Sequence, residues 1–127
     1  MTSDAIRIVM IDDDADFLEA CAVILQAEGY HVECTTDPAV FKSYFDTLPK
    51  PRVAILDVEM PEITGFELAE HIRTQQASEN IAVIILSAHR EAGDQLRGFF
   101  NGANEYLFKP VGKHQLVEMV RKVIDNG

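Results

Sequence analysis

Residues 53–65 of the chain read VAILDVEMPEITG. Four apolar residues come first, then an acid at Asp57, and then Pro61 and Gly65 within a short distance. An apolar run of this length, followed by an acid, a proline and a glycine, is typical of a buried β-strand that opens into a loop. The stretch therefore predicts that the carboxylate of Asp57 lies at the edge of a hydrophobic core.

Apolar segments followed by polar residues recur along the whole chain. Strands are expected over residues 6–11, 31–35, 52–56, 81–86 and 105–108. Apolar residues at helical spacing predict helices around residues 17–25, 38–48, 66–72, 91–100 and 116–124. The inner strands are almost continuously hydrophobic, as in a parallel sheet covered on both faces. The sequence thus predicts an open, doubly wound α/β sheet of five strands and five helices.

Polar residues mark where three of these helices begin. Asp14 or Asp16 is expected to cap the first helix and Thr64 the third, because short polar side chains bond the free backbone N–H groups of a first turn. Asp37-Pro38 opens the second helix, since proline suits the first helical position. The apolar face of this second helix is expected to extend from Val40 to Leu48.

Size and charge limit the classes of function. At 127 residues the chain is expected to form one domain, residues 1–127. Its net charge of −10 argues against a domain that grips nucleic acid by its phosphates. We find no apolar run long enough to span a bilayer and no secretory signal, so a cytoplasmic protein without membrane contact is expected.

Chemically active side chains gather where the predicted strands end. Asp12 and Asp13 follow the first strand, Asp57 the third, Ser87 the fourth and Lys109 the fifth. In an open parallel sheet, ligands bind outside the carboxyl ends of the strands. Like charges about 4 Å apart repel by about 4 kcal/mol at an effective dielectric constant near 20, so one acid is protonated or a cation lies among them. Carboxylate oxygens with open positions suit Mg²⁺.

The same group of side chains suits phosphoryl transfer. A carboxylate can act as a nucleophile and form an aspartyl phosphate. Such a transfer needs the charge on the phosphoryl oxygens to be neutralised, which a metal and a lysine supply. A hydroxyl such as that of Ser87 can bond a further phosphoryl oxygen.

In the order and spacing of these motifs, the chain resembles the receiver domain of two-component response regulators. The resemblance rests on the acid pair Asp12-Asp13, the loop from Asp57 through Met60-Pro61 to Gly65, Ser87-Ala88, and Lys109-Pro110. It covers essentially the whole chain. It implies a flavodoxin-like sheet with strand order 2-1-3-4-5.

The resemblance also implies a role for each site residue. Asp57 would be the phosphoryl acceptor, and Lys109 would contact the phosphoryl group. Asp12 and Asp13 would hold Mg²⁺, joined by Asp57 and the backbone carbonyl of Glu59. The residues themselves predict the acid cluster and the lysine; these individual roles follow from the resemblance.

Four further positions are assigned by the resemblance. Ser87 would move toward the phosphoryl group and Tyr106 would follow it inward, which would reshape the surface of the fourth helix, fifth strand and fifth helix. Glu59 and His89 would flank the phosphoryl group and influence its hydrolysis. The resemblance also favours a cis peptide bond between Lys109 and Pro110.

A receiver implies signalling partners rather than a metabolic substrate. The expected donor is a sensor histidine kinase or a histidine phosphotransfer protein, and the expected output is a downstream target protein or a fused output domain. Phe99, Phe100 and Phe108 near the output face are compatible with a homodimer on phosphorylation, and core packing explains them equally well. The domain would catalyse only its own phosphorylation and dephosphorylation, so it is not expected to be an enzyme with a separate substrate.

Other classes fit the sequence less well. A degenerate receiver that binds proteins without phosphorylation is the main alternative, although every core chemical residue is present. A magnesium-dependent aspartate phosphatase would need a second aspartate where Glu59 stands. A flavin-mononucleotide binder would need a phosphate loop where the chain has Asp12-Asp13-Asp14, which would repel phosphate.

Overall fold

The computed structural model describes residues 5–60, 63–75, 78–88 and 102–126. It contains one five-stranded sheet in the order β2-β1-β3-β4-β5, and every neighbouring pair is parallel. The strands are β1 (Arg7–Ile11), β2 (His31–Thr35), β3 (Val53–Asp57), β4 (Ala82–Ser87) and β5 (Glu105–Phe108). The predicted fold class and strand order are confirmed.

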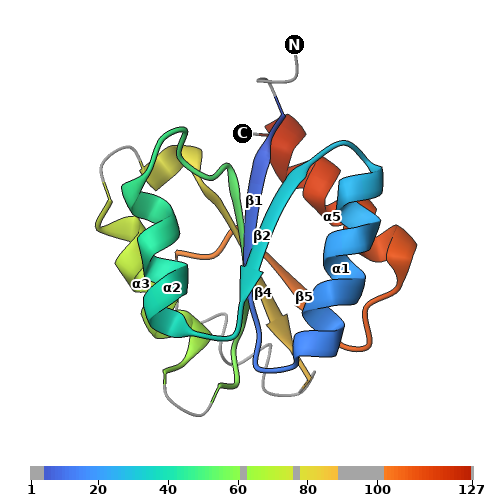
Figure 1. Cartoon of the computed structure of the whole chain (residues 1–127), viewed down its shortest axis with the longest axis horizontal. Coiled ribbons are helices and arrows are strands. Elements are labelled where there is room, and N and C mark those ends of the chain that lie inside the picture. The colour runs from blue at the N-terminus through green and yellow to red at the C-terminus, as the bar shows by residue number, and fades with distance from the viewer. Residues whose placement is uncertain (1–4, 61–62, 76–77, 89–101, 127) are drawn as a thin grey trace.

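Four α-helices lie in the described residues. They are α1 (Ala15–Ala27), α2 (Pro38–Ser43), α3 (Gly65–Arg73) and α5 (Lys113–Asn126), with short 3-10 helices at Tyr44–Asp46 and Ser78–Asn80. Helices α1 and α5 cover one face of the sheet, and α2 and α3 cover the other (Figure 1). The helix predicted over residues 91–100 lies outside the described residues, so the expected fifth helix is not described.

Helices α1 and α3 begin at capping residues that the sequence predicts. Of the two candidates for α1, Asp14 is the cap, and its carboxylate accepts a hydrogen bond from the backbone N–H of Phe17 at 3.1 Å. Thr64 caps α3 in a reciprocal arrangement, in which Thr64 and Glu67 each accept from the other's backbone N–H. Such caps fix where a helix starts, and here they set the positions of the loops that carry the acids.

The prediction for the second helix was wrong at its C-terminal end. Helix α2 ends at Ser43, and a single 3-10 turn follows it. Phe41 and Phe45 are buried as expected, but Leu48 is 83% exposed. The residue before a proline is disfavoured in the helical region, and Pro49 follows Leu48 directly. The chain therefore leaves the helix before Leu48 can reach the core.

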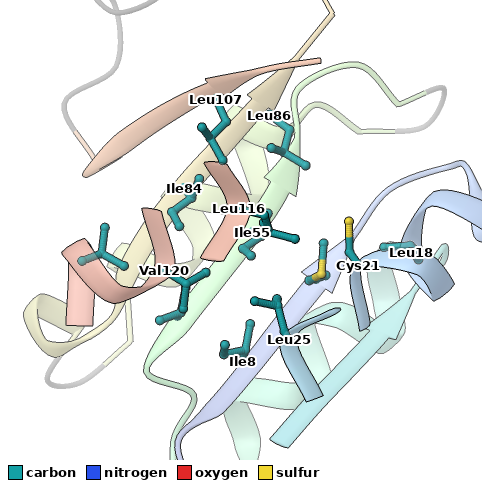
Figure 2. Packing of buried hydrophobic residues seen from close by; sticks show 13 residues of the cluster. Ile8, Leu18, Cys21, Leu25, Ile55, Ile84, Leu86, Leu107, Leu116 and Val120 are labelled. Atoms are coloured by element: carbon teal, nitrogen blue, oxygen red, sulfur yellow. The ribbon is translucent and has the colours of Figure 1, made fainter. Parts of the chain in front are cut away.

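Two hydrophobic layers enclose the sheet, one on each face. Alternate residues of a strand point to opposite faces, so Ile8 and Met10 of β1 pack under α1 and α5, whereas Val9 and Ile11 pack under α2 and α3. Figure 2 shows the first layer, where Leu18, Cys21 and Leu25 of α1 and Leu116 and Val120 of α5 meet the sheet. Each fully buried leucine or isoleucine contributes about 1.5–3 kcal/mol to stability.

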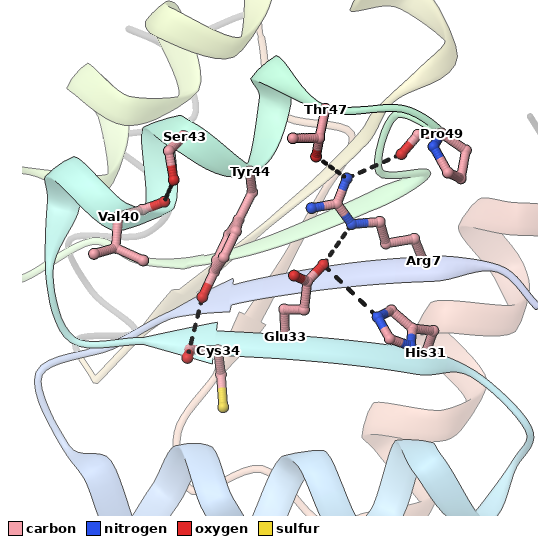
Figure 3. Close-up of polar contacts among 9 residues, drawn as sticks. All are labelled: Arg7, His31, Glu33, Cys34, Val40, Ser43, Tyr44, Thr47 and Pro49. Atoms are coloured by element: carbon pink, nitrogen blue, oxygen red, sulfur yellow. Dashed lines mark hydrogen bonds and ion pairs between the residues drawn. The ribbon is translucent and has the colours of Figure 1, made fainter.

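Arg7 fastens the connection between α2 and β3 to the sheet (Figure 3). Its guanidinium pairs with Glu33 of β2, and donates to Thr47 Oγ1 at 3.2 Å and to the carbonyl of Pro49 at 2.9 Å. The same group lies 5.9 Å from the centre of the Tyr44 ring. These contacts join β1, β2 and the segment after α2 at the end of the sheet opposite the acids.

Arg73, the last residue of α3, has a similar role near strands β4 and β5. Its guanidinium donates to the carbonyls of Ser78, Ile81 and Gly102, at 2.6 to 2.9 Å, and to Asn104 Oδ1 at 3.0 Å. The planar group with its five donors suits such a set of acceptors. It ties the C-terminus of α3 to the start of β4 and to the segment that leads into β5.

We expect Arg73→Lys to lower the free energy of unfolding by about 2 kcal/mol, because lysine cannot reach four acceptors at once and leaves half-buried carbonyls without a donor. Urea denaturation measures the change. The matched control is Arg121→Lys, where an exposed guanidinium pairs with Glu28 on the surface. A change within about 0.5 kcal/mol is expected there. Equal effects of the two substitutions would contradict the role of Arg73.

Candidate functional site

The polar residues picked out by the sequence lie at the carboxyl ends of the strands. Asp12 follows the last residue of β1, Asp57 is the last residue of β3, and Ser87 is the last residue of β4. Lys109 follows β5 directly. Strands β3 and β4 were expected to end one residue earlier; instead Asp57 itself pairs with Leu86 across the two strands, so its backbone is part of the sheet.

Three carboxylates lie close together. Asp12, Asp13 and Asp57 each offer one oxygen, and these oxygens are all within 4.8 Å of one another. Asp12 is fully buried and Asp57 is 3% exposed, whereas Asp13 is open to solvent. This set of oxygen donors, with one side open to water, fits Mg²⁺, which usually keeps several waters and takes one or two carboxylates. The expected acid cluster is therefore present.

Lys109 brings a positive charge to the same cluster. Its ammonium donates to Asp12 Oδ2 at 2.8 Å and lies 3.8 Å from Asp57 Oδ1. The backbone N–H of Lys109 donates to the carbonyl of Ser87 at 2.8 Å, which fixes the start of the segment after β5. The Lys109-Pro110 peptide bond is cis, as the resemblance to receiver domains implies.

Burial and charge change the pKa values of this cluster. Burial, with the neighbouring charge of Asp12, raises the pKa of Asp57 to about 6. Burial also raises the pKa of Asp12, although the hydrogen bond from Lys109 opposes the change. Burial alone would lower the pKa of Lys109, but its bond to Asp12 and the surrounding acids raise it instead. Two buried carboxylates and one ammonium leave an excess of negative charge, which a cation would balance.

The loop after β3 holds the Asp57 carboxylate in place. The backbone N–H of Glu59 donates to Asp57 Oδ1 at 3.2 Å, while the Glu59 side chain is exposed. The N–H of Gly65 donates to the carbonyl of Val58 at 3.2 Å. A Cβ atom on Gly65 would lie only 2.4 Å from the carbonyl oxygen of Asp57. The loop therefore closes onto the strand at a distance that only glycine allows.

The two predicted switch residues lie on neighbouring strands. Ser87 is 2% exposed, and it pairs in register with Phe108 of β5. Tyr106 is half-buried, packs against the hydrophobic layer under α2 and α3, and has a buried hydroxyl oxygen. His89, the second residue expected to influence hydrolysis, lies outside the described residues.

One contact at the site was not predicted from the sequence. The ring of Phe17 lies against Lys109, with its centre 4.8 Å from the ammonium nitrogen. Helical spacing assigns Phe17 only to the apolar face of α1. The contact joins residues more than ninety positions apart, so no local pattern signals it.

Comparisons with known proteins show the family of this chain. A sequence model of the response regulator receiver domain matches residues 8–121. The chain belongs to this family. The transcriptional regulator RpaA of Synechocystis is 29% identical over 118 residues, which are 93% of this chain and 48% of RpaA. The phosphate regulon regulator PhoB of Escherichia coli is 28% identical over 93% of this chain and 51% of PhoB. The chain thus spans about half the length of these relatives.

Solved structures show the same fold. The chemotaxis protein CheY4 of Vibrio cholerae superposes with a TM-score of 0.84 at 25% identity, over 94% of this chain and 98% of CheY4. The response regulator TrrA of Thermotoga maritima, in a complex with Mg²⁺ and BeF, gives a TM-score of 0.78 at 30% identity, over 93% of this chain and 98% of TrrA. In the residues described here, no helix has both the length and the apolar character to cross a membrane.

Proposed function

We propose that residues 1–127 form a single phosphoacceptor receiver domain of a two-component phosphorelay, with Asp57 as the acceptor. The observation that carries the proposal is the buried Asp57 carboxylate at the end of β3, beside two further acids and one lysine. The donor would be the phosphohistidine of a sensor histidine kinase or of a histidine phosphotransfer protein. The domain would act only on itself, in the cytoplasm, with no separate substrate.

The transfer would be a displacement at phosphorus. A carboxylate oxygen of Asp57 attacks the phosphorus atom of the donor, the new O–P bond forms, and the N–P bond breaks with its electron pair left on the imidazole. The ammonium of Lys109 lies close enough to Asp57 to neutralise charge on the transferred group. Ser87, at the end of the adjacent strand, would donate a hydrogen bond from its hydroxyl group to another phosphoryl oxygen. Hydrolysis of the acyl phosphate returns the free carboxylate.

Mg²⁺ is the cofactor that fits this donor set. Asp12, Asp13 and Asp57 would hold it, together with the backbone carbonyl of Glu59. When bound, the ion offsets the negative charge of the carboxylates and of the phosphoryl oxygens. The Glu59 N–H already orients Asp57 Oδ1, which leaves the rest of the carboxylate for other partners. The exposed Glu59 side chain and His89 would modulate the rate of hydrolysis.

Phosphorylation would change the output surface through Ser87 and Tyr106. Their strands are adjacent, and Tyr106 already packs inward against the hydrophobic layer. A phosphoryl group that attracts Ser87 would shift the population toward one arrangement of β5 and α5 and the helix expected before them. A target protein, a fused output domain or a second copy of the chain would read that surface; the curated relatives above are regulators about twice as long as this chain.

Native mass spectrometry tests the proposed function. The protein is measured with Mg²⁺ before and after addition of a small acyl-phosphate donor, and again with a chelator in place of Mg²⁺. We expect the wild-type protein to gain one phosphoryl group only with Mg²⁺, and Asp57→Asn to gain none. A phosphoryl group on the Asp57→Asn protein would move the acceptor elsewhere. No gain in the wild-type protein would favour a module that binds partners without phosphorylation. A shift to a dimer in the same spectra would place the output in self-association.

A further inference from the structure

Phe17 belongs to a connected network of contacts around Lys109. The backbone N–H of Asp14 donates to Asp12 Oδ1 at 3.0 Å, and the Asp14 carboxylate accepts from the N–H of Phe17 at 3.1 Å. The Phe17 ring lies over the Lys109 ammonium, and this ammonium donates to the second oxygen of Asp12. Four residues from the first loop, the start of α1 and the end of β5 therefore fix one another.

From this network of contacts, we propose that Phe17 is a positioning residue for Lys109. Its ring holds the ammonium toward Asp12 and Asp57 and thereby sets the rate at which Asp57 accepts a phosphoryl group. The inference deepens the proposed function and rests on it. It concerns how the lysine reaches its working position rather than which residue is phosphorylated.

The physical basis is the charge distribution of the aromatic ring. The face of a phenylalanine ring is partly negative and attracts an ammonium within about 6 Å of its centre. The distance here is 4.8 Å, and only 24% of the Lys109 side chain is exposed. The ring takes the place of water on one side of the ammonium, while Asp12 and Asp57 lie on others. The Lys109 side chain is thus less free to turn toward solvent. Because the ammonium is already in place, a smaller loss of side-chain entropy is needed when charge builds up on the phosphoryl oxygens.

Simple core packing is the competing explanation. Phe17 is half-buried and packs against the hydrophobic layer between α1 and the sheet, so its loss would also weaken that layer. Two properties separate the explanations. If Phe17 positions Lys109, its effect on the phosphorylation rate depends on the electrostatics of the ring face and disappears when the Lys109 ammonium is removed. A packing role depends on volume alone and is independent of Lys109.

The first measurement is the NMR signal of the Lys109 ε-CH₂ group in the protein without Mg²⁺ or phosphoryl donor. Protons above a ring face are shifted upfield by the ring current, and Lys109→Ala identifies the signal by its loss. We expect the upfield shift in the wild-type protein and in Phe17→Tyr, and its absence in Phe17→Leu. A Lys109 signal with the shift of an ordinary exposed lysine in the wild-type protein would overturn the inference without touching the proposed function.

The second measurement is the rate of phosphoryl gain from a small acyl phosphate with Mg²⁺. We expect Phe17→Leu to slow the reaction about threefold to tenfold, as loss of a partly buried cation–π contact implies, and Phe17→Tyr to stay within about twofold of the wild-type rate. Ile24→Ala is the matched control, because Ile24 packs against the same hydrophobic layer on the same helix. Its rate should equal that of the wild-type protein.

A double-mutant cycle with Lys109→Ala decides between the two explanations. In that background the effect of Phe17→Leu should fall below about twofold. If Phe17→Leu folds poorly, pentafluorophenylalanine at position 17 keeps the shape and reverses the charge of the ring face, and it should slow the reaction at least as much. An unchanged rate in either variant, or the same loss with and without Lys109, would refute the positioning role. Failure of the wild-type protein to accept a phosphoryl group would instead refute the proposed function.

Discussion

Gly65→Ala is expected to lower the free energy of unfolding by about 3 kcal/mol, at the upper end of what overpacking usually costs. An added Cβ would lie 2.4 Å from the carbonyl oxygen of Asp57 and 2.9 Å from its carbonyl carbon. Both contacts are to backbone, so no side chain can rotate away to relieve them. Either α3 moves outward, or the end of β3 shifts together with the carboxylate of Asp57. Urea denaturation measures the loss, and mass spectrometry should show slower phosphoryl gain in the same variant.

Gly112→Ala is the matched control for this substitution. Gly112 precedes α5, and among the described residues an added Cβ would meet the end of the Gln115 side chain at 3.8 Å, an ordinary contact. There the loss of chain freedom in the unfolded state should leave stability unchanged or raise it by about 0.5 kcal/mol. If Gly65→Ala were as stable as Gly112→Ala and accepted a phosphoryl group at the wild-type rate, the close approach between the loop and Asp57 would have no importance for the site.

The position of Gly65 illustrates which parts of the site the sequence predicts. Apolar runs place the strands, and the rule that parallel strands end at one edge brings Asp12, Asp57 and Lys109 together without any knowledge of side-chain contacts. The sequence places Gly65 in the loop that follows Asp57. The structure shows that this glycine closely approaches the carbonyl of Asp57, a partner that no spacing in the sequence could identify.

Long-range contacts are the part that the sequence does not predict. In the sequence, Arg73 resembles an ordinary arginine in the last turn of a helix. In the structure it donates to the carbonyls of Ile81 and Gly102, which are far apart in the sequence. Phe17 reads as one apolar residue among several of α1, but its ring reaches Lys109. The early end of α2 was missed for a different reason. Its apolar spacing continues to Leu48, and the local effect of Pro49 outweighs that pattern.

The stability of the protein without metal should fall as pH rises through the range in which Asp57 ionises. Burial and the charge of Asp12 raise the pKa of Asp57 from an ordinary value near 3.8 to about 6 in the folded state. The protonated form is therefore favoured by folding. The stabilisation is complete below the pKa of the unfolded chain and is lost as pH rises through the folded value. A difference of about two pKa units corresponds to about 3 kcal/mol at pH 7.

Asp57→Asn isolates this contribution, because asparagine resembles the protonated acid and does not ionise. In a metal chelator, we expect the two proteins to have similar free energies of unfolding near pH 4, and Asp57→Asn to be more stable at pH 7 by up to about 3 kcal/mol. Asp125→Asn, an exposed acid near the end of α5, should follow the wild-type curve. Added Mg²⁺ should then stabilise the wild-type protein at pH 7 more than Asp57→Asn, because a cation that binds only the folded state raises its stability. Parallel pH curves for wild-type and Asp57→Asn would show that burial and the charge of Asp12 together do not raise the pKa of Asp57 in the folded protein, and the electrostatic reason for placing a cation among the acids would fail.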